Sequence, residues 1–264
     1  MAVIKMNFLS QCLGMQTNVT ICLPSYSFKD RMDGREEVYV PGMKYQVLWL
    51  LHGGTGDDSD YLHFSNITRF ADDNKLAVVM PADYNASYDD DPNGAKYRTF
   101  VAEELPKMCR AIFPFSDKRE DNFSAGLSMG GGGTGKISIN YPENYAAALV
   151  MSSAGGLIAN KMRSVGGMNI RHKEPTDHIL RAQAEENLKS GKPVPKYFFT
   201  CGMDDFAFEN AEKAAQFMKE TGYDVYWEAV PGYKHEWDFW DLTLRKAINE
   251  WLPIRHSVIY PGEE

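Results

Sequence analysis

One serine in this sequence has the surroundings that nucleophilic chemistry requires. Residues 126–130 read Gly-Leu-Ser-Met-Gly and match the pattern G-x-S-x-G. In that pattern a strand turns sharply into a helix, so that the serine hydroxyl projects from the carboxyl edge of a sheet. The flanking glycines remove the Cβ atoms that would clash in such a turn. The motif therefore predicts that Ser128 is a nucleophile.

Two other interpretations of this glycine-rich segment fit less well. It could be a turn that only starts a helix, with Ser128 as the N-terminal cap. The extra glycines also suggest a phosphate-binding loop, but the pattern G-x-x-x-x-G-K-[S/T] is not completed, because Ile137 follows Lys136. A strand-like run before the motif and helical sequence after it favour the nucleophile.

A serine becomes a strong nucleophile only when a neighbouring base accepts its proton and an acid orients that base. Proteins with this motif carry the three groups in the chain order serine, acid, histidine, with the last two on loops after strands. His235 meets this condition, because it follows the predicted strand 224–230. The other five histidines precede the serine, fall in an irregular stretch or lie near the C-terminus: His52, His63, His172, His178 and His256.

Two aspartates could supply the acid. Asp204 and Asp205 both follow the predicted strand 197–201. Their position after a strand suits the acid equally well. The sequence pattern by itself leaves both residues open.

Two backbone N–H groups are needed to hold the oxyanion that forms when a serine attacks a carbonyl. One is expected from Met129, directly after the nucleophile. The other should come from the loop after an early strand, and the run His52-Gly53-Gly54-Thr55 lies there. We expect Gly54 to be this donor, with Thr55 as the alternative. His52 in such a loop is expected to support the turn.

Strands and helices alternate along most of the chain, which is typical of a mainly parallel sheet with right-handed crossovers. The sequence therefore predicts an α/β fold with helices on both faces of the central sheet, in one domain of 264 residues. The expected strands are 3–10, 15–23, 45–51, 76–80, 122–125, 145–152, 197–201 and 224–230. The expected helices are 59–74, 97–113, 134–141, 208–221 and 237–251.

Residues 155–195 interrupt this alternation. They contain a helical patch near 176–189 but no clear strand. An irregular stretch of this length in a compact domain is usually functional. We expect it to be a small cap inserted over the active face.

Composition excludes several classes of protein. With 44% hydrophobic and 24% charged residues, the chain is typical of a globular enzyme. A net charge of -8 disfavours binding to nucleic acid. Apolar runs are too short to span a membrane, and the first ten residues lack a signal-peptide pattern, so we expect a cytoplasmic protein without membrane contact. The four cysteines, at positions 12, 22, 109 and 201, lack the spacing of a zinc site, and no metal is expected.

These motifs together resemble the putative esterase (esterase D-like) family of α/β-hydrolases, in particular its tributyrin esterase and feruloyl esterase-like branch. The resemblance extends through most of the chain. Its most specific parts are residues 50–53, residues 126–131, Cys201-Gly202 with Asp205, and His235 with Trp237 and Trp240.

The resemblance implies an α/β-hydrolase fold and carboxylic ester hydrolysis through a serine acyl-enzyme, without a cofactor. It favours Asp205 as the acid, because the family's acid is the third residue after the glycine of that motif. It also implies small-molecule ester substrates with short acyl or hydroxycinnamoyl (feruloyl) groups, in some members on plant-derived sugars. Trp237, Trp240 and Thr55 are candidate substrate contacts, although both tryptophans could equally be core residues.

Two other functions stay open at this stage. An S-formylglutathione hydrolase would have the same fold and cleave a thioester. A hydrolase-like binding protein would be catalytically silent, although the complete set of serine, acid and histidine argues against it. Aromatic and methionine side chains are numerous enough to support a homo-oligomer, which the sequence does not decide.

Overall fold

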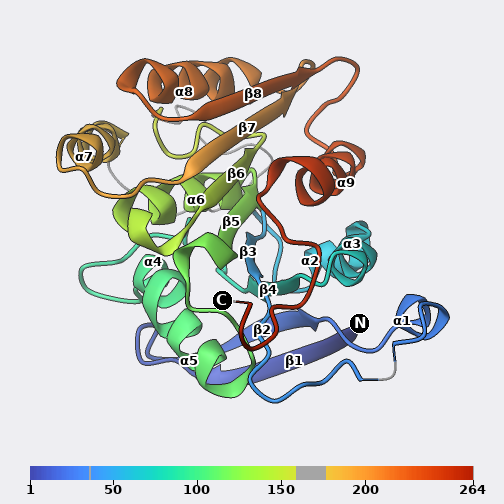
Figure 1. Cartoon of the computed structure of the whole chain (residues 1–264). Helices are drawn as coiled ribbons and strands as arrows, with labels where there is room; N and C mark the ends of the chain where they lie inside the picture. The colour runs from blue at the N-terminus through green and yellow to red at the C-terminus, as the bar shows by residue number, and fades with distance from the viewer. Residues whose placement is uncertain (36, 159–176, 264) are drawn as a thin grey trace.

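The computed structural model describes residues 1–35, 37–158 and 177–263. Their strands form a single eight-stranded sheet (Figure 1). The strand order is β1-β2-β4-β3-β5-β6-β7-β8. β1 pairs antiparallel with β2, and β2 pairs antiparallel with β4. All later neighbours in this order, including β3, pair in parallel. The strands are β1 Ala2–Leu9, β2 Gln16–Leu23, β3 Val47–Leu51, β4 Ala77–Pro81, β5 Asn122–Leu127, β6 Ala147–Met151, β7 Lys196–Gly202 and β8 Val225–Val230.

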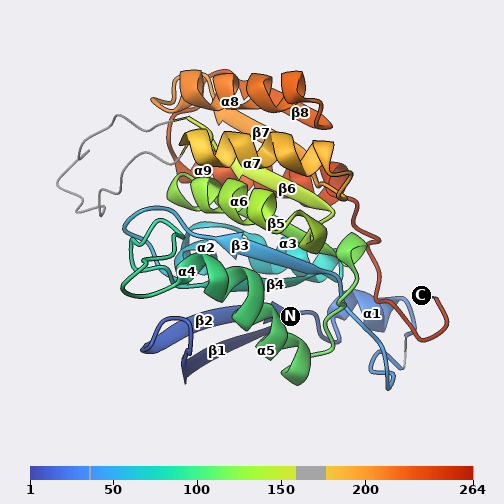
Figure 2. The ribbon, with the colours of Figure 1, turned by 90° about the vertical axis from the view of Figure 1, so that its left-hand side faces the viewer.

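Helices cover both faces of the sheet. Figure 2 looks onto the face covered by α4 to α8, and α2, α3 and α9 lie on the opposite face. The α-helices are α1 Phe28–Met32, α2 Asp60–Phe64, α3 Ile67–Asp73, α4 Tyr97–Thr99, α5 Leu105–Ile112, α6 Met129–Asn140, α7 Asp177–Lys189, α8 Phe208–Thr221 and α9 Trp237–Lys246. The π-helical turns Phe100–Glu104 and Ala247–Trp251 connect α4 to α5 and extend α9.

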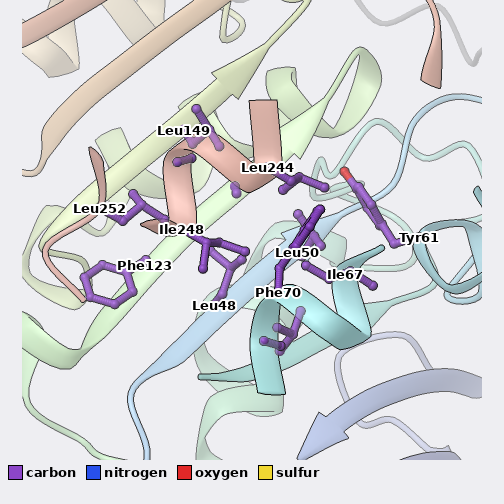
Figure 3. Close-up of a cluster of buried hydrophobic side chains, with 14 of the residues drawn as sticks. Leu48, Leu50, Tyr61, Ile67, Phe70, Phe123, Leu149, Leu244, Ile248 and Leu252 are labelled. Carbon is purple, nitrogen blue, oxygen red and sulfur yellow. The ribbon is translucent and has the colours of Figure 1, made fainter. Parts of the chain in front are cut away.

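The central strands are apolar because helices cover them on both sides. Every residue of β3, β4, β5 and β6 is buried. Leu48 and Leu50 of β3 point to the α3 and α9 side, whereas Trp49 and Leu51 belong to the core on the other face. Figure 3 shows the first of these cores, in which Phe70 of α3 packs close to the β3 leucines. The expected α/β-hydrolase architecture is confirmed.

One expected helix, 59–74, is divided into α2 and α3. The Ser65 hydroxyl donates a hydrogen bond to the carbonyl of Tyr61 and accepts one from the N–H of Ile67. The N–H of Asn66 donates to the carboxylate of Asp241 on α9, at 2.6 Å. Side-chain partners therefore replace the helical hydrogen bonds at this point, which the apolar periodicity alone does not reveal.

Another expected helix begins earlier than predicted. The prediction placed its start at residue 134, but α6 begins at Met129 and includes the glycine run. Glycine disfavours helices in isolation, and here close packing overrides that preference. A Cβ on Gly130 would clash with the backbone carbonyl of Leu51, so the helix can approach β3 only because this side chain is absent.

Part of the expected cap contributes to the main fold. α7 lies between α6 and α8 and packs Leu180, Ala184 and Leu188 into the same core as β6 and β7. Residues 159–176 lie outside the described residues, so a cap in that part of 155–195 stays a prediction. In the part of the chain that the structure covers, no helix is long and apolar enough to cross a membrane.

Candidate active site

Ser128 occupies the turn between β5 and α6. Its backbone angles are φ 53° and ψ -117°, an unfavourable region for a residue with a side chain. A Cβ on Gly126 would clash with the backbone of Gly130 across the same turn. The strand–turn–helix context predicted for the G-x-S-x-G motif is therefore present, and the serine is half-buried at the carboxyl end of β5.

Asp205 and His235 lie beside this serine, each on a loop after a strand. His235 Nε2 is 2.9 Å from Ser128 Oγ. Its other ring nitrogen, Nδ1, is 3.0 and 2.9 Å from the two carboxylate oxygens of Asp205. Because β5, β7 and β8 are parallel, their carboxyl ends lie at one edge of the sheet and bring the three loops together.

The structure distinguishes the two candidate acids. Asp205 is 5% exposed and contacts His235, whereas Asp204 is exposed and its N–H donates to the carbonyl of Tyr233. Burial by itself raises the pKa of Asp205. Hydrogen bonds from His235 and from the N–H of Ala207 outweigh this effect and hold the pKa below its usual value. Asp205 is therefore a carboxylate that directs the Nδ1 proton of His235 toward itself and leaves Nε2 facing the serine.

The candidate oxyanion donors are two backbone N–H groups, those of Met129 and of a residue in the loop after β3. Met129 is the first residue of α6, so its N–H has no acceptor within the helix. In the other loop, the N–H of Thr55 donates to Asn85 Oδ1 at 2.7 Å, whereas the N–H of Gly54 donates to no described residue. Gly53 holds this loop close to the serine, since a Cβ there would lie 3.6 Å from that of Ser128. Of the two alternatives in this loop, Gly54 therefore keeps its donor free.

His52 is a structural residue of this loop. Its Nε2 accepts a hydrogen bond from the N–H of Asp83 at 2.9 Å, which leaves the proton on Nδ1, 2.7 Å from the carbonyl of Gly53. A ring that accepts at Nε2 is neutral, and burial, which lowers the pKa of His52, favours the same form. The expectation that this histidine supports the turn agrees with these contacts.

Aromatic side chains surround His235. Phe206 lies with its ring centroid 4.3 Å from that of the imidazole and is 58% exposed. The ring centroid of Trp240 lies 4.9 Å from that of His235, but Trp240 is buried and donates its indole N–H to Ser152, which favours a packing role. Trp237 is half-buried and stacks on the exposed Phe64.

Two of these aromatic residues were not predicted. Phe206 directly follows Asp205 and contacts His235, whereas Phe64 ends α2 and contacts Trp237, and both positions depend on how the loops fold. The only sequence signal was the proximity of Phe206 to Asp205. The contacts of Thr55, Trp237 and Trp240 with substrate stay predictions.

A polar hollow of about 380 Å³ lies beside this aromatic cluster. Its walls come from the end of α2, the connection from α2 to α3, and α9. They carry the carboxylates of Asp238 and Asp241, and no lysine or arginine is among the lining residues. The lining residues are His63, Phe64, Ser65, Asn66, Asp238 and Asp241.

Within the described ranges, no group of three or more histidine, cysteine or acidic side chains is placed to hold a metal ion. The cysteines at positions 12, 22, 109 and 201 are all unpaired. What the site does contain is a hydrogen-bonded serine, histidine and carboxylate beside two backbone donors. Such an arrangement can attack a carbonyl and stabilise the resulting oxyanion.

Comparison with known proteins identifies relatives over almost the whole chain. A sequence model of the family described as Putative esterase matches residues 10–253. An acetyl esterase of Caldicellulosiruptor saccharolyticus is 30% identical over 270 residues, covering 96% of this chain and 98% of that protein.

Two solved structures from Staphylococcus aureus are similar in both sequence and fold. One is FphF, a fluorophosphonate-binding serine hydrolase, with a TM-score of 0.80. The other is FrmB, described as an S-formylglutathione hydrolase, with a TM-score of 0.78. Each is 28% identical to this chain, and each alignment covers 96% of this chain and 98% of the other.

Proposed function

This chain belongs to the Putative esterase family, and on that premise we propose that it hydrolyses short-chain acyl esters through an acyl-enzyme on Ser128. The observation that carries the proposal is the continuous hydrogen-bond chain from Ser128 through His235 to Asp205. A serine connected in this way has a base for its proton and an acid that orients the base.

Acylation begins when Ser128 Oγ attacks the ester carbonyl and His235 Nε2 accepts the serine proton. The oxyanion of the tetrahedral intermediate accepts hydrogen bonds from the N–H groups of Met129 and Gly54. His235 then donates its proton to the leaving alcohol as the C–O bond breaks, which leaves the acyl group on the serine. Asp205 stabilises the imidazolium during these steps.

Deacylation repeats the sequence with water. His235 accepts a proton from water, and the hydroxide attacks the acyl carbonyl under the same two N–H donors. The serine leaves with the proton from His235, and the carboxylic acid is released. No cofactor takes part in either half of this mechanism.

Short acyl groups are the first choice of substrate because a relative that is 30% identical is named an acetyl esterase. Tributyrin and hydroxycinnamoyl (feruloyl) esters are included on the basis of the sequence resemblance. The exposed ring of Phe206 beside His235, and that of Phe64 stacked on Trp237, would suit an aromatic acyl or alcohol group.

A glutathione thioester is the second candidate substrate, favoured by the similarity to FrmB. One feature of this chain argues against it. Glutathione carries excess negative charge, and the hollow near the aromatic cluster presents Asp238 and Asp241 with no lysine or arginine among its lining residues. Neutral esters meet no such repulsion.

A substrate panel tests the proposal. Purified protein and its Ser128→Ala variant would be assayed with p-nitrophenyl esters from acetate to decanoate, tributyrin, methyl ferulate, acetylated xylo-oligosaccharide and S-formylglutathione. We expect turnover to be highest with the short neutral esters and to be lost in the Ser128→Ala variant while its melting temperature is retained. Preference for the thioester by orders of magnitude would favour the second candidate, and undiminished hydrolysis by the variant would exclude the serine mechanism.

A fluorophosphonate label separates an active enzyme from a silent binding protein. Labelling of the wild type at Ser128, identified by peptide mass, is expected because the reagent reacts with an activated serine. Absence of both labelling and turnover would leave the fold in place and support the binding-protein interpretation.

A further inference from the structure

The loop after β4, residues 83–89, contacts the loop that carries Gly54. The N–H of Asp83 donates to His52 Nε2 at 2.9 Å, and the Tyr88 hydroxyl donates to the carbonyl of His52 at 3.1 Å. Asn85 Oδ1 accepts the N–H of Thr55 at 2.7 Å. These bonds fix the chain on both sides of Gly53 and Gly54, which leaves the Gly54 peptide little freedom to turn.

The same loop is attached to α6, which begins with Met129. Lys136 Nζ donates to the carbonyl of Ser87 and to the carboxylate of Asp89, both at 2.8 Å. The Tyr88 ring packs against Gly133, where a Cβ would come within 2.5 Å of it. Loop 83–89 therefore connects the two elements that present the oxyanion donors.

The backbone of this loop adopts an unfavourable conformation. Tyr84, Asn85, Ser87 and Tyr88 all have positive φ angles, between 50° and 61°. Asparagine tolerates this region, but tyrosine and serine adopt it rarely. Such backbone persists where surrounding contacts hold it, and it concentrates at functional sites.

We propose that Tyr88 and Asn85 are positioning residues that hold the Gly54 N–H in register with that of Met129, so that both donors face one oxyanion. The inference rests on the proposed serine mechanism. It assigns no new chemistry to either side chain, because neither is required to touch the substrate. Their effect should appear in the transition state, where the oxyanion forms, and not in ground-state binding.

Removal of one hydroxyl group tests this inference. In Tyr88→Phe the ring stays and only the hydrogen bond to His52 is lost. We expect kcat for p-nitrophenyl acetate to fall about tenfold, less than the hundredfold or more that follows loss of an oxyanion donor itself. KM should stay within about twofold of the wild type, since substrate binding precedes charge development.

Tyr45→Phe is the matched control. Tyr45 is also a buried tyrosine that donates to a backbone carbonyl at 3.1 Å, that of Pro24, but it lies away from the site. Tyr45→Phe should lower the melting temperature about as much as Tyr88→Phe does and leave kcat unchanged. An equal loss of kcat in Tyr45→Phe would show a general destabilisation and overturn the assignment.

Asn85→Gly tests the second contact without imposing a new backbone preference, because glycine accepts positive φ. It should reduce kcat with little change in KM, as Tyr88→Phe does. An increase in KM at constant kcat in either variant would contradict the inference, because the loop would then shape the pocket and not the donors.

Fluorophosphonate labelling separates this inference from the proposed function. The reagent also passes through a transition state with a developing oxyanion, so we expect both variants to be labelled about tenfold more slowly than the wild type. Normal labelling of the wild type with unchanged rates in the variants overturns only the role of loop 83–89. Failure of the wild type to be labelled at Ser128 overturns the proposed function, and the positioning role with it.

Discussion

Asp205 combines burial with a negative charge, which is tolerated because its carboxylate accepts hydrogen bonds from His235 and Ala207. In Asp205→Asn the amide keeps the shape but presents an N–H to the imidazole, which favours the wrong tautomer. We predict a fall in kcat of about 1000- to 10 000-fold, measured with p-nitrophenyl acetate.

Asp204→Asn is the control for this substitution, because the exposed Asp204 lies next in sequence. It should retain wild-type kcat. The reverse pattern, with activity lost in Asp204→Asn and kept in Asp205→Asn, would show that the acid has been assigned to the wrong aspartate.

Asp83 predicts an unusual pH dependence of stability. Burial raises the pKa of this carboxyl to about 7, although the N–H of Tyr88 and the charge of Lys136 favour its ionised form. Burial lowers the pKa of its neighbour His52, which disfavours a compensating positive charge there. In the unfolded chain the pKa is about 3.9. The folded state therefore binds one more proton between pH 4 and 7, so this group's contribution to the free energy of unfolding falls as pH rises through that range.

Urea unfolding at pH 5 and pH 8 measures this effect. Relative to Asp83→Asn, which cannot ionise, the wild type should lose about 2 to 3 kcal/mol between the two pH values. Exposed Asp204→Asn serves as the control and should follow the wild type. A constant difference between wild type and Asp83→Asn across this range would falsify the assignment.

Sequence motifs pointed to the proposed catalytic residues. They did not point to the residues proposed to position the oxyanion donors. Pattern and order were enough to select Ser128 and His235. They left Asp204 and Asp205 open, and only the family resemblance favoured Asp205. Asn85 and Tyr88 have no such motif, because their role depends on a contact between two loops that are separate in sequence.

At the scale of elements, the glycines of α6 differ in what they contact. A Cβ on Gly130 would clash with the backbone of β3, whereas one on Gly132 would meet only Ser153 Oγ, at 3.9 Å. Gly132→Ala is predicted to stabilise the protein by up to about 1 kcal/mol, because alanine favours a helix. Gly130→Ala should destabilise it by several times that amount or prevent folding, since neither backbone can move freely.

Thermal or urea unfolding of the two variants gives the comparison directly. Both substitutions add the same methyl group to the same helix, so a difference in sign isolates the contact with β3. Equal effects would mean that α6 can shift away from the sheet.

The periodicity of apolar residues located most of the helices and strands. It failed where side-chain hydrogen bonds or close packing between elements decide where a helix begins or ends. The buried strands β3 to β6 were predicted because apolar residues are required on both faces. The division between α2 and α3 depends on hydrogen bonds of Ser65 and Asn66. The early start of α6 depends on space beside β3, which no local pattern records.

At the scale of the whole molecule, net charge should influence which substrates arrive. With a net charge of -8 the protein repels anions, and salt screens that repulsion. We predict that kcat/KM for S-formylglutathione increases severalfold between about 10 and 200 mM NaCl. The neutral p-nitrophenyl acetate serves as the internal control and should not respond. A fall in the thioester rate with salt would indicate a local basic site for glutathione.

The order of the active-site residues along the chain affects when the site can assemble during synthesis and folding. During synthesis the proposed nucleophile Ser128 emerges more than a hundred residues before the proposed base His235, whose loop follows the last strand, β8. α9 must then return to α3, where Asp241 binds Asn66 across 175 positions in sequence. Contacts this distant form late in folding. A nascent chain therefore carries an unactivated serine until its final helix docks, and in refolding experiments esterase activity should recover after the helical signal has returned.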